Sequence, residues 1–317
     1  MRIALAQLHS CPGDQRANIE KVGRVLSALS SRADLVVFPE LFLSGYYLAA
    51  DEDLERCALE LPPAAAFPPA AAPAPAGGDA PLHPLLQLSA LARDSRTALC
   101  VSFPERAAGS LSLFITAAVF DSDGALAAAH RKTQLWGARE HRLFAPGGGP
   151  FAPFALAAFP AVPLGLLICF ELEFPEPARV LALRGARALL CVAASGEANS
   201  FTSLRFAPVR AAENGAALAW VNFPDSPPPG APSGVAFSGG SGAWGPDGAP
   251  LHGAGGEAVD GEASQAATAA VAALPGERVC VVCVDVDGAH FAAHRERNPY
   301  LAARRAELFQ QILRRTQ

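Results

Sequence analysis

The sequence lacks the features that mark membrane-spanning, secreted and nucleic-acid-binding proteins. No apolar run in its 317 residues reaches the roughly 20 residues that cross a bilayer, so no membrane partner is expected. Lysines and arginines number 25 against 30 acidic residues, and they form no basic stripe before the C-terminal segment, so no nucleic acid is expected. Gln7 and His9 cut the first apolar run too short for a signal peptide. These absences favour an intracellular, cytoplasmic protein.

Cysteine is sparse and carries no metal-binding pattern. The seven cysteines are an odd number and widely spaced, which argues against a disulfide framework. Cys280 and Cys283 match C-x-x-C, but they lie within a strand-like apolar run and not at the strand-to-helix turn of a redox motif. No second C-x-x-C and no H-E-x-x-H occur to complete a zinc site. We therefore expect no metal ion.

Nucleotide-binding and serine-hydrolase motifs are missing as well. The chain has neither a Walker-type G-x-x-x-x-G-K nor a G-x-S-x-G elbow. Residues 240–245 satisfy G-x-G-x-x-G by letter, but they lead into the turn Pro246-Asp247-Gly248. Without a following helix there is no helix N-terminus to bind a pyrophosphate, so a dinucleotide site is not expected there.

Short apolar runs alternate with amphipathic stretches along the chain, which favours an α/β or α+β layered fold. Turn signals at 121–124 and 246–248 predict hairpins, so the sheets should be mixed and not purely parallel. The pattern predicts strands at 2–7, 34–38, 97–103, 113–121, 124–129, 162–168, 186–193, 216–222 and 278–286. It predicts helices at 15–30, 82–94, 176–184, 203–213 and 300–314.

One segment differs in composition from the rest. Residues 62–81 are almost all proline, alanine and glycine, a composition that cannot pack a core and is typical of a surface insert. Residues 253–270 are similar. Helical and strand patterns resume at once on both sides of each, so we expect a single domain over 1–317 with an insert at 62–81.

Three reactive side chains lie, in chain order, at the edges of apolar runs: Glu40, Lys132 and Cys169. Each alone has an ordinary explanation, as a turn carboxylate, a solvated surface cation and a small buried hydrophobe. Together they supply what amide hydrolysis through a thioester needs, namely a proton acceptor, a fixed positive charge and a nucleophile. Glu140 lies a few residues beyond Lys132, where it can orient the ammonium.

The position of each residue at a strand end sharpens this interpretation. Cys169 ends an apolar strand before a turn into a helix, so its thiol should face the open end of a sheet. The backbone N–H of Phe170 is then free to stabilise an oxyanion. Apolar walls would raise the pKa of Glu40, whereas a nearby lysine would lower it. In either case Glu40 can exchange protons with a thiol or an amine.

These motifs, taken in order, resemble the carbon–nitrogen hydrolase (nitrilase-like) superfamily over nearly the whole chain. No single motif is specific, but the complete ordered set is. The matching stretches are Phe38-Pro39-Glu40-Leu41, residues 130–135 with Glu140, Phe144 and Gly147, residues 165–176, residues 209–215, residues 239–248 and residues 298–305.

The resemblance implies a four-layer αββα sandwich that assembles into a homodimer or a higher homo-oligomer. It also implies a Glu40-Lys132-Cys169 triad assisted by Glu140, with Phe170 N–H in the oxyanion site. Glu40 would exchange protons with the thiol, the leaving amine and a water molecule. No metal or organic cofactor would be needed, and the partner would be a small amide substrate.

The residues around Cys169 resemble the amidase-like branches of the superfamily. The chain has Cys169-Phe170-Glu171 where true nitrilases usually carry Cys-Trp-Glu, and it has Glu173 where omega-amidase-like branches place an arginine. Neutral or amine-bearing amides are therefore favoured. Other departures from the family pattern, including His130 where a tyrosine is frequent, leave the substrate open. A nitrilase, an N-carbamoyl amine or amino-acid hydrolase, and a catalytically silent binding protein of the same fold remain alternatives.

Overall fold

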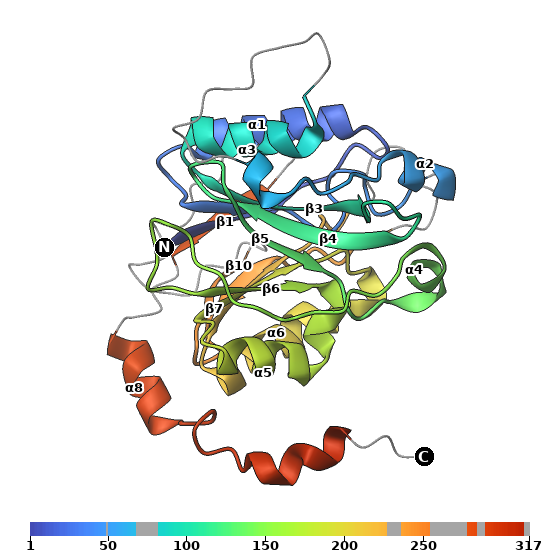
Figure 1. Cartoon of the computed structure of the whole chain (residues 1–317). Helices are drawn as coiled ribbons and strands as arrows, with labels where there is room; N and C mark the ends of the chain where they lie inside the picture. The colour runs from blue at the N-terminus through green and yellow to red at the C-terminus, as the bar shows by residue number, and fades with distance from the viewer. Residues whose placement is uncertain (49, 68–81, 227–235, 254–277, 284–288, 314–317) are drawn as a thin grey trace.

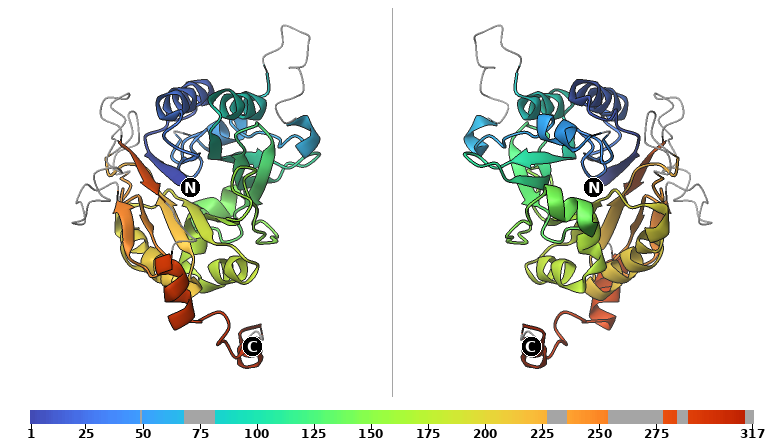
Figure 2. Two further views of the ribbon diagram at one scale, coloured as in Figure 1. Left: turned by 90° about the vertical axis from the view of Figure 1, so that its left-hand side faces the viewer. Right: turned by 90° about the vertical axis from the view of Figure 1, so that its right-hand side faces the viewer.

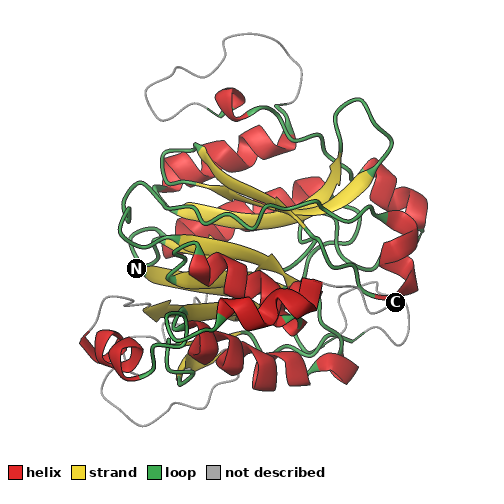
Figure 3. Cartoon of the chain, turned by 60° about the horizontal axis from the view of Figure 1, so that its bottom comes forward, coloured by secondary structure: helices red, strands yellow, loops and turns green. Residues whose placement is uncertain are grey.

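Two β-sheets lie face to face, and helices cover the outer side of each (Figure 1). The computed structural model describes residues 1–48, 50–67, 82–226, 236–253, 278–283 and 289–313. Views from the two sides show the sheets nearly edge-on between the helix layers (Figure 2). A view from below again places helices outside and strands inside (Figure 3). This layering confirms the expected αββα sandwich.

The first sheet contains six strands in the order β11-β1-β2-β3-β4-β5. Strands β1, β2 and β3 run parallel, whereas β11, β4 and β5 pair antiparallel with their neighbours. Helices α1 (Gln15–Leu29) and α3 (Pro84–Ser95) cover its outer face. The strands are β1 (Arg2–Gln7), β2 (Leu35–Val37), β3 (Ala98–Arg106), β4 (Leu113–Phe120), β5 (Leu126–Arg131) and β11 (Arg278–Cys283).

The second sheet contains five strands in the order β10-β9-β8-β7-β6. The parallel strands β6 (Leu164–Ile168), β7 (Ala188–Val192) and β8 (Ala217–Val221) are buried throughout, as expected for strands covered on both faces. A Cβ on Gly165 would lie 2.8 Å from a methyl of Leu181, so the glycine allows the covering helix to approach β6 closely. The remaining elements of this layer are β9 (Gly242–Trp244), β10 (Pro250–Gly253), α5 (Pro175–Leu183) and α6 (Ala207–Asn214).

Shorter helical segments connect the layers and shape the loops at the ends of the strands. They are α2 (Asp51–Arg56), α4 (Gly137–Leu143), α8 (Ala289–Arg297), a π-helical turn at Thr202–Phe206, and 3₁₀ segments at Ala64–Ala66, Cys169–Glu173, Glu197–Asn199 and Ala306–Leu313. None of the helices in the described part of the chain has the length and apolarity that crossing a membrane requires.

The main elements fall where the sequence pattern predicts them, including the hairpins β4–β5 and β9–β10 around the two turn signals. The prediction of one helix at 300–314 is wrong. The helix α8 comes earlier, at Ala289–Arg297, and a 3₁₀ segment occupies only 306–313. Pro299 explains the break, because a proline disfavours helical backbone in the residue before it.

One residue of the proline- and alanine-rich stretch at 62–81 packs into the core. The first residues of this stretch are described, and Phe67 is 2% exposed with its ring centroid 5.4 Å from that of Phe120. The expectation that 62–81 contributes nothing to the core is therefore wrong at Phe67. Residues 68–81 and most of the similar stretch at 253–270 lie outside the described residues.

Candidate active site

The carboxylate of Glu40 is fixed at the point where the two sheets meet. The chain leaves β2 with the N–H of Phe38 donating to the carbonyl of Cys100 on β3 at 3.0 Å. The N–H of Glu40 then donates to the carbonyl of Ala193, which follows β7 of the other sheet, at 3.2 Å. Leu41 turns the chain with a φ of +51°, a conformation that costs a non-glycine residue energy. Main-chain hydrogen bonds to both sheets thus fix the backbone at Glu40.

Lys132 follows β5 and is held by main-chain hydrogen bonds on both sides. Its N–H donates to the carbonyl of Ile115 on β4, and its carbonyl accepts from the N–H of Gly147, each at 2.8 Å. A Cβ at position 147 would lie 2.3 Å from the carbonyl oxygen of Arg131, so only glycine fits there. The returning segment at Gly147 therefore fixes the backbone from which Lys132 extends.

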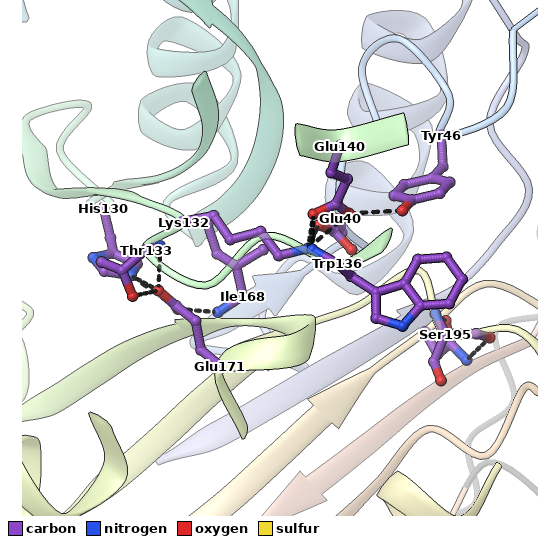
Figure 4. A network of polar contacts seen from close by, with 11 residues as sticks. Glu40, Tyr46, His130, Lys132, Thr133, Trp136, Glu140, Ile168, Glu171 and Ser195 are labelled. Atoms are coloured by element: carbon purple, nitrogen blue, oxygen red, sulfur yellow. Dashed lines mark hydrogen bonds and ion pairs between the residues drawn. The ribbon is translucent and has the colours of Figure 1, made fainter. Parts of the chain in front are cut away.

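The ammonium of Lys132 lies between two buried carboxylates (Figure 4). Its Nζ is 2.7 Å from Oε1 of Glu40 and 2.8 Å and 2.9 Å from the two carboxylate oxygens of Glu140. All three side chains are at most 2% exposed. Burial alone would lower the pKa of Lys132, but the surrounding negative charge raises it, so the group remains an ammonium.

Glu140 is itself oriented by two donors that sequence reasoning missed. The hydroxyl of Tyr46 donates to one carboxylate oxygen at 2.6 Å, and the backbone N–H of Trp136 donates to the other at 2.7 Å. Burial raises the pKa of the Tyr46 phenol, and the nearby carboxylates raise it further. Tyr46 therefore stays protonated and acts as a donor.

Cys169 begins the sharp turn that follows β6, as the sequence predicts. Its φ is +48°, a left-handed value that strains a residue with a Cβ. The residue is only half-buried, so small molecules can reach it. Burial raises the pKa of its thiol and the charge of Glu40 raises it further, while Lys132 lowers it. At rest the thiol is protonated, and its attack requires a base.

Glu40 has the properties of that base. Burial raises its pKa to about 7, although the Lys132 ammonium lowers it. Its Oε1 accepts from Lys132, and a hydrogen bond from the Cys169 thiol also lowers the pKa of this carboxylate. No other side chain among the described residues occupies Oε2. One oxygen of a carboxylate that titrates near neutral pH is therefore available to take a proton.

A third buried carboxylate, Glu171, connects the loop that carries Lys132 to the turn that carries Cys169 (Figure 4). It accepts from the backbone N–H and the hydroxyl of Thr133, both at 2.7 Å, and from the N–H of Ile168 at 2.7 Å. Its carboxylate also lies 2.9 Å from Nε2 of His130. Burial alone would raise the pKa of Glu171, but these hydrogen bonds lower it. These four donors, two of them from the neighbour of Lys132 and one from the neighbour of Cys169, fix the lysine loop and the cysteine turn relative to each other.

Replacing Glu171 by glutamine should destabilise the fold. An amide offers a single acceptor oxygen and adds an NH₂ donor that would face existing donors, which leaves buried groups without partners. We expect a loss of about 3 kcal/mol in the free energy of unfolding, measured by urea denaturation. Glu173→Gln is the matched control, since Glu173 is two residues away and only half-buried, and it should lose less than about 1 kcal/mol. Equal losses in both variants would contradict the tethering role.

A narrow pocket opens onto Cys169. Its walls combine aromatic rings, one carboxylate and the loop that follows β7. The lining residues are Tyr46, Trp136, Cys169, Phe170, Glu173, Ala194, Ser195, Gly196 and Asn199. A larger groove of about 880 Å³ lies on the outer helices α1 and α3, away from every residue of the ion cluster. The reactive side chains therefore point to the narrow pocket, and not the groove on the outer helices, as the candidate active site.

The loop after β7 is fixed by Asn222, another residue that sequence reasoning missed. The side-chain carbonyl of Asn222 accepts from the N–H of Ser195 at 2.9 Å, and its amide donates to the carbonyl of Ser195 at 3.1 Å. Asn222 is fully buried at the end of β8. It thereby fixes the part of the pocket wall that Ser195 forms.

The described residues form no cluster of three or more histidine, cysteine, aspartate or glutamate side chains suited to a metal ion. Five cysteines in the described part of the chain are free thiols, namely Cys11, Cys57, Cys100, Cys169 and Cys191.

Residues 242–244, within the G-x-G-x-x-G match, form strand β9 and lead into a hairpin, as predicted.

Comparisons with known proteins agree with this arrangement. A family model described as carbon-nitrogen hydrolase matches residues 2–272. The chain is 29% identical over 99% of its length to a Pseudomonas protegens protein named hydrolase in pqqF 5′ region, of which it covers 93%. It is 29% identical to an (R)-stereoselective amidase from a Pseudomonas species, with 82% of each chain covered.

Solved structures show the same fold. An amidase from a Nesterenkonia species superposes with a TM-score of 0.70 at 28% identity, covering 98% of this chain and 95% of that one. A glutamate-to-glutamine mutant of that amidase shows Michael addition of acrylamide at its active site cysteine. A cysteine-to-alanine mutant of it has been solved in complex with butyramide.

Proposed function

Because the chain belongs to the carbon–nitrogen hydrolase family, we propose that it hydrolyses a small linear carboxamide to a carboxylic acid and ammonia. The observation that carries the proposal is the Lys132 ammonium held between Glu40 and Glu140, beside a strained and reachable Cys169. The butyramide complex of the structurally similar amidase supports an amide as the substrate.

The first half of the reaction forms a thioester. Glu40 takes the proton of the Cys169 thiol as sulfur attacks the amide carbonyl, and a C–S bond forms. The carbonyl oxygen becomes negative and is stabilised by the Lys132 ammonium and the Phe170 N–H. That N–H lies in the first turn of a 3₁₀ segment, where main-chain donors have no partner within the helix. The C–N bond then breaks, and the leaving nitrogen takes the proton from Glu40 to depart as ammonia.

The second half releases the acid. Glu40 accepts a proton from water as the water oxygen attacks the thioester carbonyl, and the same donors stabilise the second oxyanion. When this intermediate collapses, the C–S bond breaks and Glu40 returns its proton to the sulfur of Cys169. Glu140 keeps the ammonium in place throughout, because Tyr46 and Trp136 fix its own orientation. The enzyme thus ends each cycle in its starting protonation state.

The proposal is tested by measuring ammonia release from a panel of amides, nitriles and N-carbamoyl compounds. Turnover of simple amides supports it, and the absence of any product across the amides would contradict it. Release of carbon dioxide together with ammonia would favour the N-carbamoyl alternative. The chain is 28% identical, over 59% of its length, to a tomato N-carbamoylputrescine amidase, so N-carbamoylputrescine is the N-carbamoyl compound to include in the panel. Turnover of nitriles alone would favour a nitrilase.

The pH dependence of the rate should report the titration of Glu40. With a pKa of about 7, Glu40 holds a proton below neutral pH and cannot accept the one from the thiol. We therefore expect kcat/KM to rise with pH, tenfold per unit below about pH 7, and to level off above it. Butyramide is a suitable substrate because it has no ionisable group of its own. A flat profile from pH 5 to 8 would argue against Glu40 as the base.

The oligomeric state and the cellular location of the protein stay predictions. The resemblance to the superfamily favours a homodimer or a higher homo-oligomer, and the cytoplasmic location is an expectation that fractionation of cells would test. The 3₁₀ segment at Ala306–Leu313 lies apart from the sandwich in two views and exposes Leu308 and Phe309, which supports assembly (Figures 1 and 2). Analytical ultracentrifugation of the full chain measures the oligomeric state directly.

A further inference from the structure

Glu173 is a carboxylate in the wall of the reactive pocket that the proposed mechanism does not use. It is half-buried, and its Oε1 accepts one hydrogen bond, from the hydroxyl of Thr202 at 3.0 Å. Partial burial raises the pKa of Glu173, which the Thr202 hydrogen bond and the Lys132 charge lower. Within the described residues no arginine, lysine or histidine forms an ion pair with it. Its negative charge is therefore incompletely compensated.

The other pocket walls also suit a cation. Tyr46, Trp136 and Phe170 line the same pocket, and aromatic faces attract ammonium groups through their ring quadrupoles. The charges around the pocket also favour a positively charged ligand. Glu40 and Glu140 share the single cation Lys132, and Glu173 adds a further carboxylate to the pocket wall. Arg210 and Arg139 donate to the main-chain carbonyls of Glu173 and Tyr46, but each is ion-paired with another carboxylate, Glu213 and Asp51 respectively. The region has an excess of negative charge before any substrate binds.

We propose that Glu173 and these aromatic side chains form a subsite for a positively charged group of the substrate. The preferred substrates are then short amides that carry an ammonium group on the chain beyond the reacting carbonyl. Glu173 and Cys169 line the same narrow pocket, so the ammonium group of such a substrate lies a short distance from the carbonyl that Cys169 attacks. An anionic amide is repelled by the same carboxylate, which gives selectivity through both attraction and repulsion. This inference rests on the proposed amide hydrolysis.

Three amides of matched length and different charge test the subsite. They are β-alaninamide, which carries an ammonium group, butyramide, which is neutral, and succinamate, which carries a carboxylate. We expect kcat/KM to be highest for β-alaninamide and lowest for succinamate. In Glu173→Gln, kcat/KM for β-alaninamide should fall about 10- to 100-fold, as expected for loss of a charged hydrogen bond, while butyramide changes less than about threefold.

A matched control separates the subsite from a general change in charge. Glu176 is exposed at the start of α5 and is not part of the pocket, so Glu176→Gln should leave the order and the ratios of the three amides unchanged. Equal kcat/KM for the cationic and neutral amides in the unmodified enzyme would overturn the proposal. A Glu173→Gln variant that slows both amides by the same factor would overturn it as well.

A second measurement does not depend on turnover. Alkylation of Cys169 by 2-bromoethylammonium and by iodoacetamide, followed by peptide mass spectrometry, compares a cationic with a neutral reagent at the same thiol. The ratio of the two rates should fall at least about fivefold in Glu173→Gln and stay constant in Glu176→Gln. An unchanged ratio in Glu173→Gln overturns the subsite even if no amide is hydrolysed. Failure of amide hydrolysis with a changed ratio would instead overturn the proposed function alone.

Discussion

Replacing Cys169 by alanine should lower kcat for amide hydrolysis by at least about 10⁴-fold, the scale seen when a covalent nucleophile is removed. The reason is that no thioester can form, while Glu40 and Lys132 retain only their electrostatic effects. The variant should still fold, because Cys169 is half-buried and the substitution removes a single atom. Ammonia release measures the activity, and urea denaturation measures the stability.

Cys100→Ala provides the matched control for this substitution. Cys100 is fully buried on β3, and burial raises the pKa of its thiol to about 12, so it is unreactive. Its variant should lose stability through a small cavity but keep kcat within about twofold. Activity in Cys169→Ala close to that of the unmodified enzyme would exclude the thioester route. If neither the variant nor the unmodified chain releases ammonia, a catalytically silent protein of the same fold becomes the alternative.

The strand-end positions of the reactive residues could be predicted from sequence because each ends a continuous apolar run. Glu40 and Cys169 follow strands β2 and β6, which are buried along their whole length. A residue that follows such a strand emerges at the edge of a sheet, so periodicity alone locates it. The nearness of Glu40 to Lys132, 92 positions apart, was suggested only by the family resemblance.

The residues that hold the side chains of the proposed triad in place could not be found in this way. Tyr46 contacts a residue 94 positions away, and Glu171 contacts His130 across 41 positions. Nothing in the local pattern distinguishes a buried glutamate with several donors from a surface glutamate beside a strand. The one available signal at Glu171 was its place within the cysteine motif, next to an apolar strand that leaves no room for an unpaired charge.

Replacing Lys132 by methionine should affect both activity and stability, because the ammonium serves both. Without it the oxyanion loses a fixed positive charge, and Glu40 holds its proton more tightly, so kcat should fall at least about 10³-fold. Glu40 and Glu140 would remain buried without a cation, at a cost of about 3–5 kcal/mol at pH 8. Lys21→Met changes the only other lysine of the chain, far from Cys169 on α1, and should leave kcat unchanged.

The pH dependence of this loss distinguishes unpaired charge from lost packing. Burial raises the pKa of Glu40, and in the Lys132→Met variant the positive charge that lowers it is gone, so folding favours the protonated form of Glu40. A group with a raised folded-state pKa contributes stability at low pH and loses it as the pH rises. Urea midpoints should therefore lie closer to those of the unmodified enzyme at pH 5 than at pH 8.

Adding Glu140→Gln to Lys132→Met removes one of the two buried carboxylates that have lost their cation. The double variant should recover part of the stability at pH 8 but none of the activity. A loss of equal size at both pH values, unrelieved by the second substitution, would mean that Lys132 stabilises the fold by filling space and not through its charge.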